Sequence, residues 1–186
     1  MKRIVLIISF LAIAALCASA QVYMNFSDMS AMPAPVKMPV QYPAHSNMVW
    51  NNFLCVTPAL WSGRGPGFRA PSVVTNVVFI GGPAATSAGT ISLTSMKAIA
   101  VVPTFQPISM TLSAGWGPNN LHVTALFNSG ATATVIWKLT TTPQIFKFPP
   151  AWTNVNHLVF APDPSLANAF PAPGSMVIYD FLLVEH

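Results

Sequence analysis

Side chains that could carry out catalysis are scarce in this chain of 186 residues. Its four carboxylates belong to Asp28, Asp163, Asp180 and Glu185. Glycoside hydrolysis commonly needs two carboxylates that flank the sugar bond, and Asp28 with Asp180 is the one pair that we expect to meet. Because neither residue lies in a recognisable catalytic context, a glycoside hydrolase is only a remote alternative.

Other kinds of catalytic centre find no support in the sequence. The four histidines are far apart and show no metal-binding spacing such as H-x-x-x-H. No G-x-S-x-G motif marks a nucleophilic serine, and Cys55 has no basic neighbours that would favour a thiolate. The glycines at 63, 65 and 67 precede no expected helix, so a phosphate-binding loop is not predicted. We therefore expect a protein without catalytic activity.

Aromatic rings are the remaining candidates for a binding site. Of the five tryptophans, Trp61 and Trp116 are flanked by turn residues and are predicted to be the exposed ones, although each could equally plug the end of a sandwich. The others, Trp50, Trp137 and Trp152, lie in or beside apolar segments and are expected in the core. The C–H face of a sugar can stack on an exposed ring. Nearby polar groups that could bind its hydroxyls are those of Arg64, Arg69, Asn119 and Asn120.

The first twenty residues have the pattern of a secretory signal. Lys2 and Arg3 precede an apolar stretch at 4–16, and Ala18-Ser19-Ala20 supplies the small residues of a cleavage site. The apolar stretch is shorter than the roughly 20 residues that a membrane-spanning helix needs. We expect cleavage between Ala20 and Gln21, which would give a secreted protein, with a single domain at 21–186 and no membrane association.

The composition is apolar and nearly uncharged. Hydrophobic residues make up 53% of the chain and charged residues 6%, against about a quarter charged in ordinary domains. Disorder is not expected of so apolar a chain. With so few charged residues, the surface must consist largely of Ser, Thr, Asn, Gly and Pro. A surface of this kind suits a wall or matrix environment and favours self-association. Lysines and arginines are scattered apart from Arg64 and Arg69, so the clustered footprint of a nucleic-acid-binding protein is missing.

Cys55 is the only cysteine beyond the signal-like segment. An intramolecular disulfide is therefore not expected. Its apolar neighbours in Phe53-Leu54-Cys55-Val56 predict a buried side chain that behaves as a small hydrophobe. The alternative is an intermolecular bridge, through which the chain would associate with itself.

Prolines and glycines divide the chain into short segments that are rich in strand-forming residues. Leu121–Phe127 and Ala131–Trp137 alternate between apolar and polar residues, and Asn128-Ser129-Gly130 between them predicts a hairpin. One short helical turn is expected near 165–168. Many short strands without intervening helices predict an antiparallel β-sandwich of jelly-roll type. The expected strands are 22–27, 49–56, 73–80, 89–96, 98–103, 107–114, 120–127, 131–139, 143–148, 155–160 and 175–184.

Four segments resemble those of small secreted jelly-roll proteins that are common in fungi. Asn25–Met29 is similar to the F-D-D-L opening of that family, and Tyr42 with 49–56 to its Y-x-G-L-x-W-x-N-F-x-V segment. The stretch 146–160 resembles F-x-F…W…L-x-F, and 176–184 the closing D-(D/N)-φ-x-φ strand. The family is similar to galactose-binding-like and carbohydrate-binding-module sandwiches, so the resemblance implies a non-catalytic β-sandwich.

The resemblance also implies that the first and last strands are neighbours and that a structural calcium ion lies between Asp28 and Asp180. Calcium needs six to eight oxygen ligands, and Ser27 stands where the family has an aspartate. The simpler alternative is that Asp28 caps a turn and Asp180 bonds backbone at a strand edge. No other cofactor is expected. Asn25-Phe26-Ser27 is the one N-glycosylation sequon.

Taken together, the sequence predicts a secreted, non-catalytic binding module whose ligand is a glycan or a cell-wall polymer. The alternative from another class is a structural or interaction protein, such as a secreted effector or matrix component, that takes no small ligand.

Overall fold

The computed structural model describes residues 20–39, 42, 48–60, 65–68, 76–80, 89–93, 103–162 and 176–186. In these residues the chain forms twelve β-strands and one short 3-10 helix, η1 (Pro66–Phe68). The first six strands are β1 (Ala20–Met24), β2 (Val36–Lys37), β3 (Met48–Asn51), β4 (Leu54–Val56), β5 (Val77–Ile80) and β6 (Gly89–Leu93). The last six are β7 (Phe105–Ala114), β8 (Asn119–Phe127), β9 (Thr132–Leu139), β10 (Gln144–Lys147), β11 (Val155–Pro162) and β12 (Met176–Glu185).

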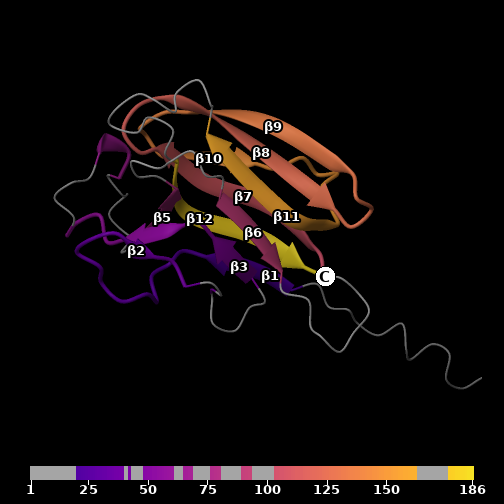
Figure 1. The fold of residues 1–186 in the computed structure, drawn as a ribbon, viewed down its shortest axis with the longest axis horizontal. Coiled ribbons are helices and arrows are strands. Elements are labelled where there is room, and N and C mark those ends of the chain that lie inside the picture. The colour runs from indigo at the N-terminus through magenta and orange to yellow at the C-terminus, as the bar shows by residue number, and fades with distance from the viewer. Residues whose placement is uncertain are drawn as a thin grey trace, which may run out of the picture.

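Eight of these strands form two antiparallel layers with jelly-roll connectivity (Figure 1). The order is β5-β12-β7-β10 in the first layer and β6-β11-β8-β9 in the second. The chain crosses from one layer to the other at every connection from β5 to β12 except the β8–β9 hairpin. Two interleaved layers of this order define the jelly roll, so the predicted fold class is confirmed.

The remaining strands extend the two layers. β1 lies against the second half of β12, so the first and last strands are neighbours as the resemblance implied. β4 and β2 continue the first layer beyond β5, and β3 continues the second layer beyond β6. The layers also meet at one corner, where Val155 of β11 pairs with Phe105 of β7.

The structure corrects the expected strands at three places. The strand expected at 49–56 is two strands, β3 and β4, because Asn52 between them has a positive φ of 62°. Asparagine tolerates this left-handed conformation, and the bend lets the chain pass from the second layer to the first. β1 ends at Met24 instead of residue 27, and β2 was not predicted because it lies in a proline-rich connection. The strand expected at 98–103 and the helical turn at 165–168 fall almost wholly outside the described residues.

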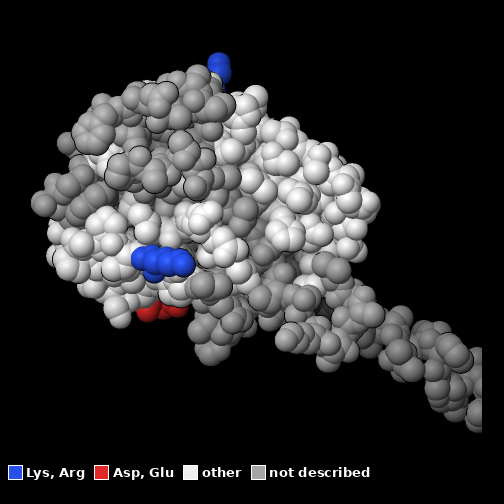
Figure 2. All heavy atoms as spheres, viewed as in Figure 1, with Lys and Arg blue, Asp and Glu red and all other residues white. Residues whose placement is uncertain are grey.

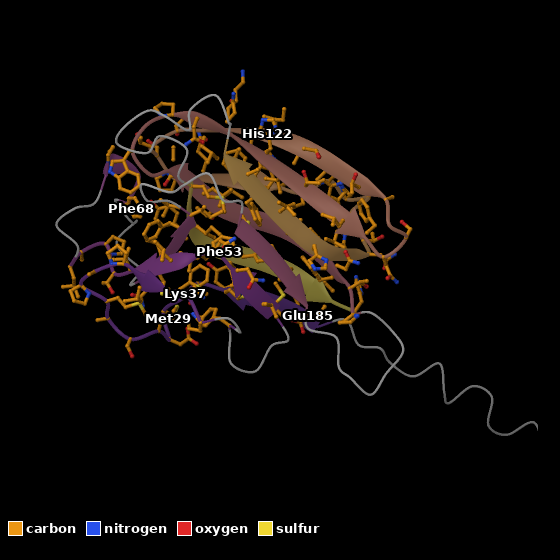
Figure 3. The ribbon with its side chains drawn as sticks, in the orientation of Figure 1. Met29, Lys37, Phe53, Phe68, His122 and Glu185 are labelled. Atoms are coloured by element: carbon orange, nitrogen blue, oxygen red, sulfur yellow. The ribbon has the colours of Figure 1, made fainter. Side chains whose placement is uncertain are left out.

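The predicted hairpin is confirmed in position and in the faces of its strands. β8 and β9 make eight consecutive pairs, from Asn119 opposite Leu139 to Leu126 opposite Thr132. Gly130 has a φ of 82° and donates its N–H to the carbonyl of Phe127 over 2.9 Å, which closes the turn. Alternate side chains of β8 are buried, whereas His122 lies on the outer face, as Figure 3 shows.

The main core fills the space between the two layers. Trp50, Trp137 and Trp152 are buried in it, as predicted. A second, smaller cluster lies on the opposite face of β12, where Val177 and Tyr179 pack with residues of β4, β5 and η1. Phe53 and Phe68 mark the two clusters in Figure 3. The segment 65–68 thus covers part of the outer face of the first layer.

The glycines of this covering segment are explained by close contact. A Cβ atom on Gly67 would lie 1.6 Å from the carbonyl oxygen of Ala114, and one on Gly65 would lie 2.4 Å from that of Gly115. The N–H of Gly67 donates to the carbonyl of Gly115 over 2.9 Å, and the hydroxyls of Ser113 and Tyr179 donate to the carbonyl of Gly67. These glycines therefore allow two backbones to meet.

Among the described residues, the structure has no helix with the length and apolar character to cross a membrane.

Candidate ligand-binding site

Trp116 is the one described member of the pair of tryptophans predicted to bind ligand. Its ring is partly exposed and packs edge-on against Phe68, with ring centroids 5.0 Å apart. The ring also lies over Gly65, where an added Cβ would meet it at 2.7 Å. Trp116 therefore covers the second cluster on the outer face of the first layer and does not plug an end of the sandwich. Ligand binding at its exposed part stays a prediction. Trp61, Arg64 and Arg69 lie outside the described residues.

Asn119 and Asn120 do not form one surface. Asn119 begins β8 with only 7% of its surface exposed, and Asn120 is partly exposed. Consecutive side chains in a strand point to opposite faces, so only Asn120 shares the outer face of the second layer. The amide of Asn119 is thus poorly placed for a ligand on that face.

Asp28 lies in the turn that follows β1. The hydroxyl of Tyr42 donates to its carboxylate, and burial together with that carboxylate raises the pKa of Tyr42. In the same turn, Oδ1 of Asn25 accepts hydrogen bonds from the backbone N–H (3.1 Å) and the hydroxyl (2.7 Å) of Ser27. The sequon asparagine is exposed in a turn, outside the strand that was expected to contain it. Its glycosylation stays a prediction.

Asp180 lies in β12, just before the residues that pair with β1 and opposite Thr111 of β7. The register with β7 shifts between Ile178 and Asp180, and the carboxylate accepts the N–H of Thr111 over 3.1 Å. The predicted bond to backbone is therefore present, but at an irregularity inside the sheet and not at its edge. Burial is the main cause that raises the pKa of Tyr23, and the nearby Asp180 adds to it.

These contacts bear on the calcium site implied by the resemblance. Each of the two carboxylates already accepts a hydrogen bond, and the carbonyls of Phe26 and Met29 accept the amide N–H groups of Asn76 at 3.1 and 2.8 Å. The described residues contain no group of three or more His, Cys, Asp or Glu side chains that could hold a metal ion. The described oxygens are thus already bonded to protein donors and fall short of the six to eight that calcium needs, and the calcium site stays a prediction.

Cys55 is buried in β4, as predicted. Its sulfur lies 3.3 Å from that of Met32 and 3.6 Å from the carbonyl oxygen of Val36, and burial raises the pKa of the thiol to about 11. A disulfide with a second chain would therefore require β4 to open. Self-association through Cys55 stays a prediction that this burial disfavours.

A hollow of about 580 Å³ lies at the turn end of the β8–β9 hairpin. Phe127, Asn128 and Ser129 of the hairpin form one side of it. The connection from β10 to β11 forms the other side with Ala151, Thr153 and Asn154, and Thr104 completes the lining. The backbone N–H of Asn128 donates to the carbonyl of Asn154 over 3.3 Å and ties the two sides together. The volume lies within the range of about 300–1,000 Å³ that is typical of small-molecule sites.

The lining combines one aromatic ring with neutral hydrogen-bonding groups. Phe127 is partly buried, and its ring meets that of the core residue Trp152 edge-on at 6.4 Å. The side chains of Asn128, Ser129, Thr153 and Asn154 are exposed around it, and none of the described lining residues is charged. This arrangement suits an uncharged ligand that has both an apolar face and hydroxyl groups.

Comparisons with known proteins name no family for this chain. No protein-family model matches it, and no curated protein matches it. One solved structure with detectable similarity is described as "Family 16 Carbohydrate Binding Module-2". It has a TM-score of 0.31 and 13% sequence identity, over 72% of this chain and 89% of that one. A similarity at this level supports no inference about function, so such an inference depends on the residues that line the hollow.

Sequence reasoning missed the hollow because its two sides are far apart in the chain. Asn128-Ser129-Gly130 was interpreted only as a turn, and Trp152 only as a core residue. The two sides meet because Val155 at the start of β11 pairs with Phe127 at the end of β8. The one signal in the sequence was the concentration of Asn, Ser and Thr beside aromatic residues at both places.

Proposed function

We propose that this protein is a secreted, non-catalytic jelly-roll module that binds a neutral glycan, such as a cell-wall polymer, in the hollow beside Phe127. The observation that carries this proposal is the described lining, in which exposed amides and hydroxyls surround an aromatic ring and none of the described residues is charged. Secretion rests on the signal-like sequence of the first twenty residues.

The chemistry of a sugar matches these groups one by one. The C–H face of a pyranose packs on an aromatic ring, and Phe127 offers its ring from a position fixed by Trp152. Each asparagine amide provides both a donor and an acceptor, and each Ser or Thr hydroxyl can act as either. Sugar hydroxyls need this dual capacity.

The lack of charge among the described lining residues favours neutral sugars over charged ones. A uronic acid, a sulfated sugar or a phosphate would favour a charge-assisted partner, and the described lining residues provide none. The same lack of ionisable groups disfavours hydrolysis within the hollow, since a glycosidase needs paired carboxylates. The proposal is therefore binding without cleavage.

Asn128→Ala and Asn154→Ala test the site. Binding of the purified protein to soluble neutral polysaccharides (a β-glucan, a xylan, a mannan and a galactan) is measured by affinity electrophoresis and calorimetry, with an anionic pectin for comparison. We expect each variant to weaken the best neutral interaction at least about tenfold, or roughly 1.4 kcal/mol.

Asn51→Ala, at an exposed position of β3, is the matched control and should bind like the unmodified protein. Trp116→Ala tests the surface that the sequence favoured. A loss of binding in Trp116→Ala with full binding in both hollow variants would transfer the site to Trp116 and overturn the assignment to Phe127. Absence of binding to every neutral polysaccharide would overturn the proposed function.

A second candidate function is that of a structural or interaction protein. It is favoured by large apolar side chains that remain at the surface, including Ile136 at 59% and Ile145 at 70% exposure. These residues lie on the outermost strands of the two layers.

A further inference from the structure

β9 is the outermost strand of the second layer among the described strands. It pairs with β8 through eight consecutive residue pairs, and the described residues provide no strand on its other side. Figure 1 shows it along the upper margin of the molecule. Its unpaired backbone groups form a row of about 27 Å, since an antiparallel strand rises about 3.4 Å per residue.

This row has only one of the features that usually prevent edge strands from pairing with other chains. Natural edge strands are kept short, carry lysine or another charge, contain proline or an inward-facing charge, or have a bulge. β9 has eight residues, no proline and no register shift against β8. Its inward side chains are all apolar, and its one charged residue, Lys138, faces outward. In contrast, β10 at the edge of the other layer has four residues and is flanked by Pro143 and Pro149.

The outer face beside this edge is also almost free of charge. Figure 2 shows one blue side chain at the upper margin, where β9 runs, and mostly neutral atoms over the rest of β8, β9 and β11. β9 presents Thr132, Thr134 and Ile136 on that face, and Ile136 is 59% exposed. β-Branched residues are favourable in paired strands. Lys138 is therefore the one charge on β9 that a second strand has to avoid.

We propose that β9 is a homodimer interface, in which β9 of a second copy pairs with it antiparallel about a two-fold axis at Ile136. In a dimer with two-fold symmetry the same surface of both copies forms the interface. One unpaired strand edge in each copy is therefore enough to form the dimer. The five strands β3-β6-β11-β8-β9 would then continue into the same five strands of the partner. This proposal does not depend on the ligand of the hollow.

The lysine side chains of the two β9 strands do not lie opposite each other in this register. With Ile136 opposite its own copy, Lys138 of one chain lies opposite Thr134 of the other. The two lysines are then four residues apart along the strands, or roughly 14 Å. This separation exceeds the screening length of about 8 Å at physiological salt. Like charges directly opposite each other, which destabilise a pair of strands, are avoided.

In this register residue 134 faces Lys138 of the partner, so substitutions there test whether the sign of a charge at residue 134 changes the stability of the dimer. Thr134→Lys would place a lysine opposite Lys138 of the partner, twice in the dimer, whereas Thr134→Glu would place a carboxylate there. Thr134 is exposed, and its hydroxyl lies 2.8 Å from that of Thr124 on β8. Thr124→Lys is the matched control, because it adds the same charge to the same face on a strand that is paired on both sides.

The measurement is sedimentation velocity of the purified protein over a wide range of concentration, with circular dichroism to verify folding. We expect the unmodified protein, Thr134→Glu and Thr124→Lys to dimerise, and Thr134→Lys to dissociate at least about tenfold more readily, less so at high salt. A monomeric unmodified protein at every concentration would overturn the proposal. So would a dimer that Thr134→Lys and Thr134→Glu affect equally, since the interface would then lie elsewhere.

Discussion

The carboxylate of Glu185, near the end of β12, lies in surroundings that disfavour its charge. The residue pairs with Ala20 of β1 and with Phe105 of β7. Its Oε1 is buried and finds no hydrogen-bond donor in the described part of the chain. Burial raises the pKa of this carboxyl above its ordinary value. The folded protein therefore holds this proton at pH values where the unfolded chain has released it.

This shift has a definite consequence for stability. Between the ordinary pKa of about 4.3 and the raised one, the folded state binds more protons than the unfolded state, so stability falls as pH rises. We expect Glu185→Gln, which removes the charge but keeps the shape, to raise the melting temperature slightly at neutral pH. The gain should vanish below about pH 4, where Glu185 is protonated in both states. A gain that is constant with pH, or a loss at neutral pH, would contradict this account.

At the scale of elements, the covering segment 65–68 depends on the lack of a side chain at Gly67. Gly67→Ala would bring a Cβ within 1.6 Å of the carbonyl oxygen of Ala114, so the segment or β7 must move. Overpacking of this kind costs about 1–3 kcal/mol. The hydrogen bonds that Ser113 and Tyr179 donate to the carbonyl of Gly67 would be strained at the same time.

Gly117→Ala is the matched control for this element. No atom lies within 4 Å of the Cβ that it adds, so we expect a change in unfolding free energy of no more than about 0.5 kcal/mol. Chemical denaturation followed by circular dichroism measures both variants. Equal stability of Gly67→Ala and the unmodified protein would show that the segment does not rest on β7.

How far the sequence predicted these elements depends on whether each signal is local. Alternation in Leu121–Phe127 and the Asn128-Ser129-Gly130 turn are local, and they predicted the hairpin down to its inward and outward faces. The break at Asn52 was missed, because a single left-handed residue leaves the apolar pattern around it intact. The hollow beside Phe127 was missed for a different reason. It depends on the register between β8 and β11, which no local pattern reveals.

For the whole molecule, the two proposals together predict a bivalent protein. The hollow lies at the end of β8 where β9 begins, and an antiparallel β9–β9 pair places the two hollows toward opposite ends of the joined strands. Phe127 lies level with residue 131, five residues from the axis at Ile136, so the two hollows are at least about 34 Å apart. A polymer chain could occupy both hollows, and linked sites of this kind can gain about 10²–10⁴ in avidity.

Thr134→Lys distinguishes the avidity of the dimer, which has two hollows, from the affinity of a single hollow for its ligand. We expect this variant to bind a short neutral oligosaccharide as the unmodified protein does, because the hollow is unchanged, and to lose retention on the corresponding immobilised polysaccharide. Asn154→Ala should weaken binding to both ligands, and Thr124→Lys should weaken neither. Calorimetry with the oligosaccharide and retention on the polymer measure the two effects. If Thr134→Lys became monomeric and was still retained fully on the polymer, the dimer would exist without contributing to binding, and one hollow would suffice for attachment.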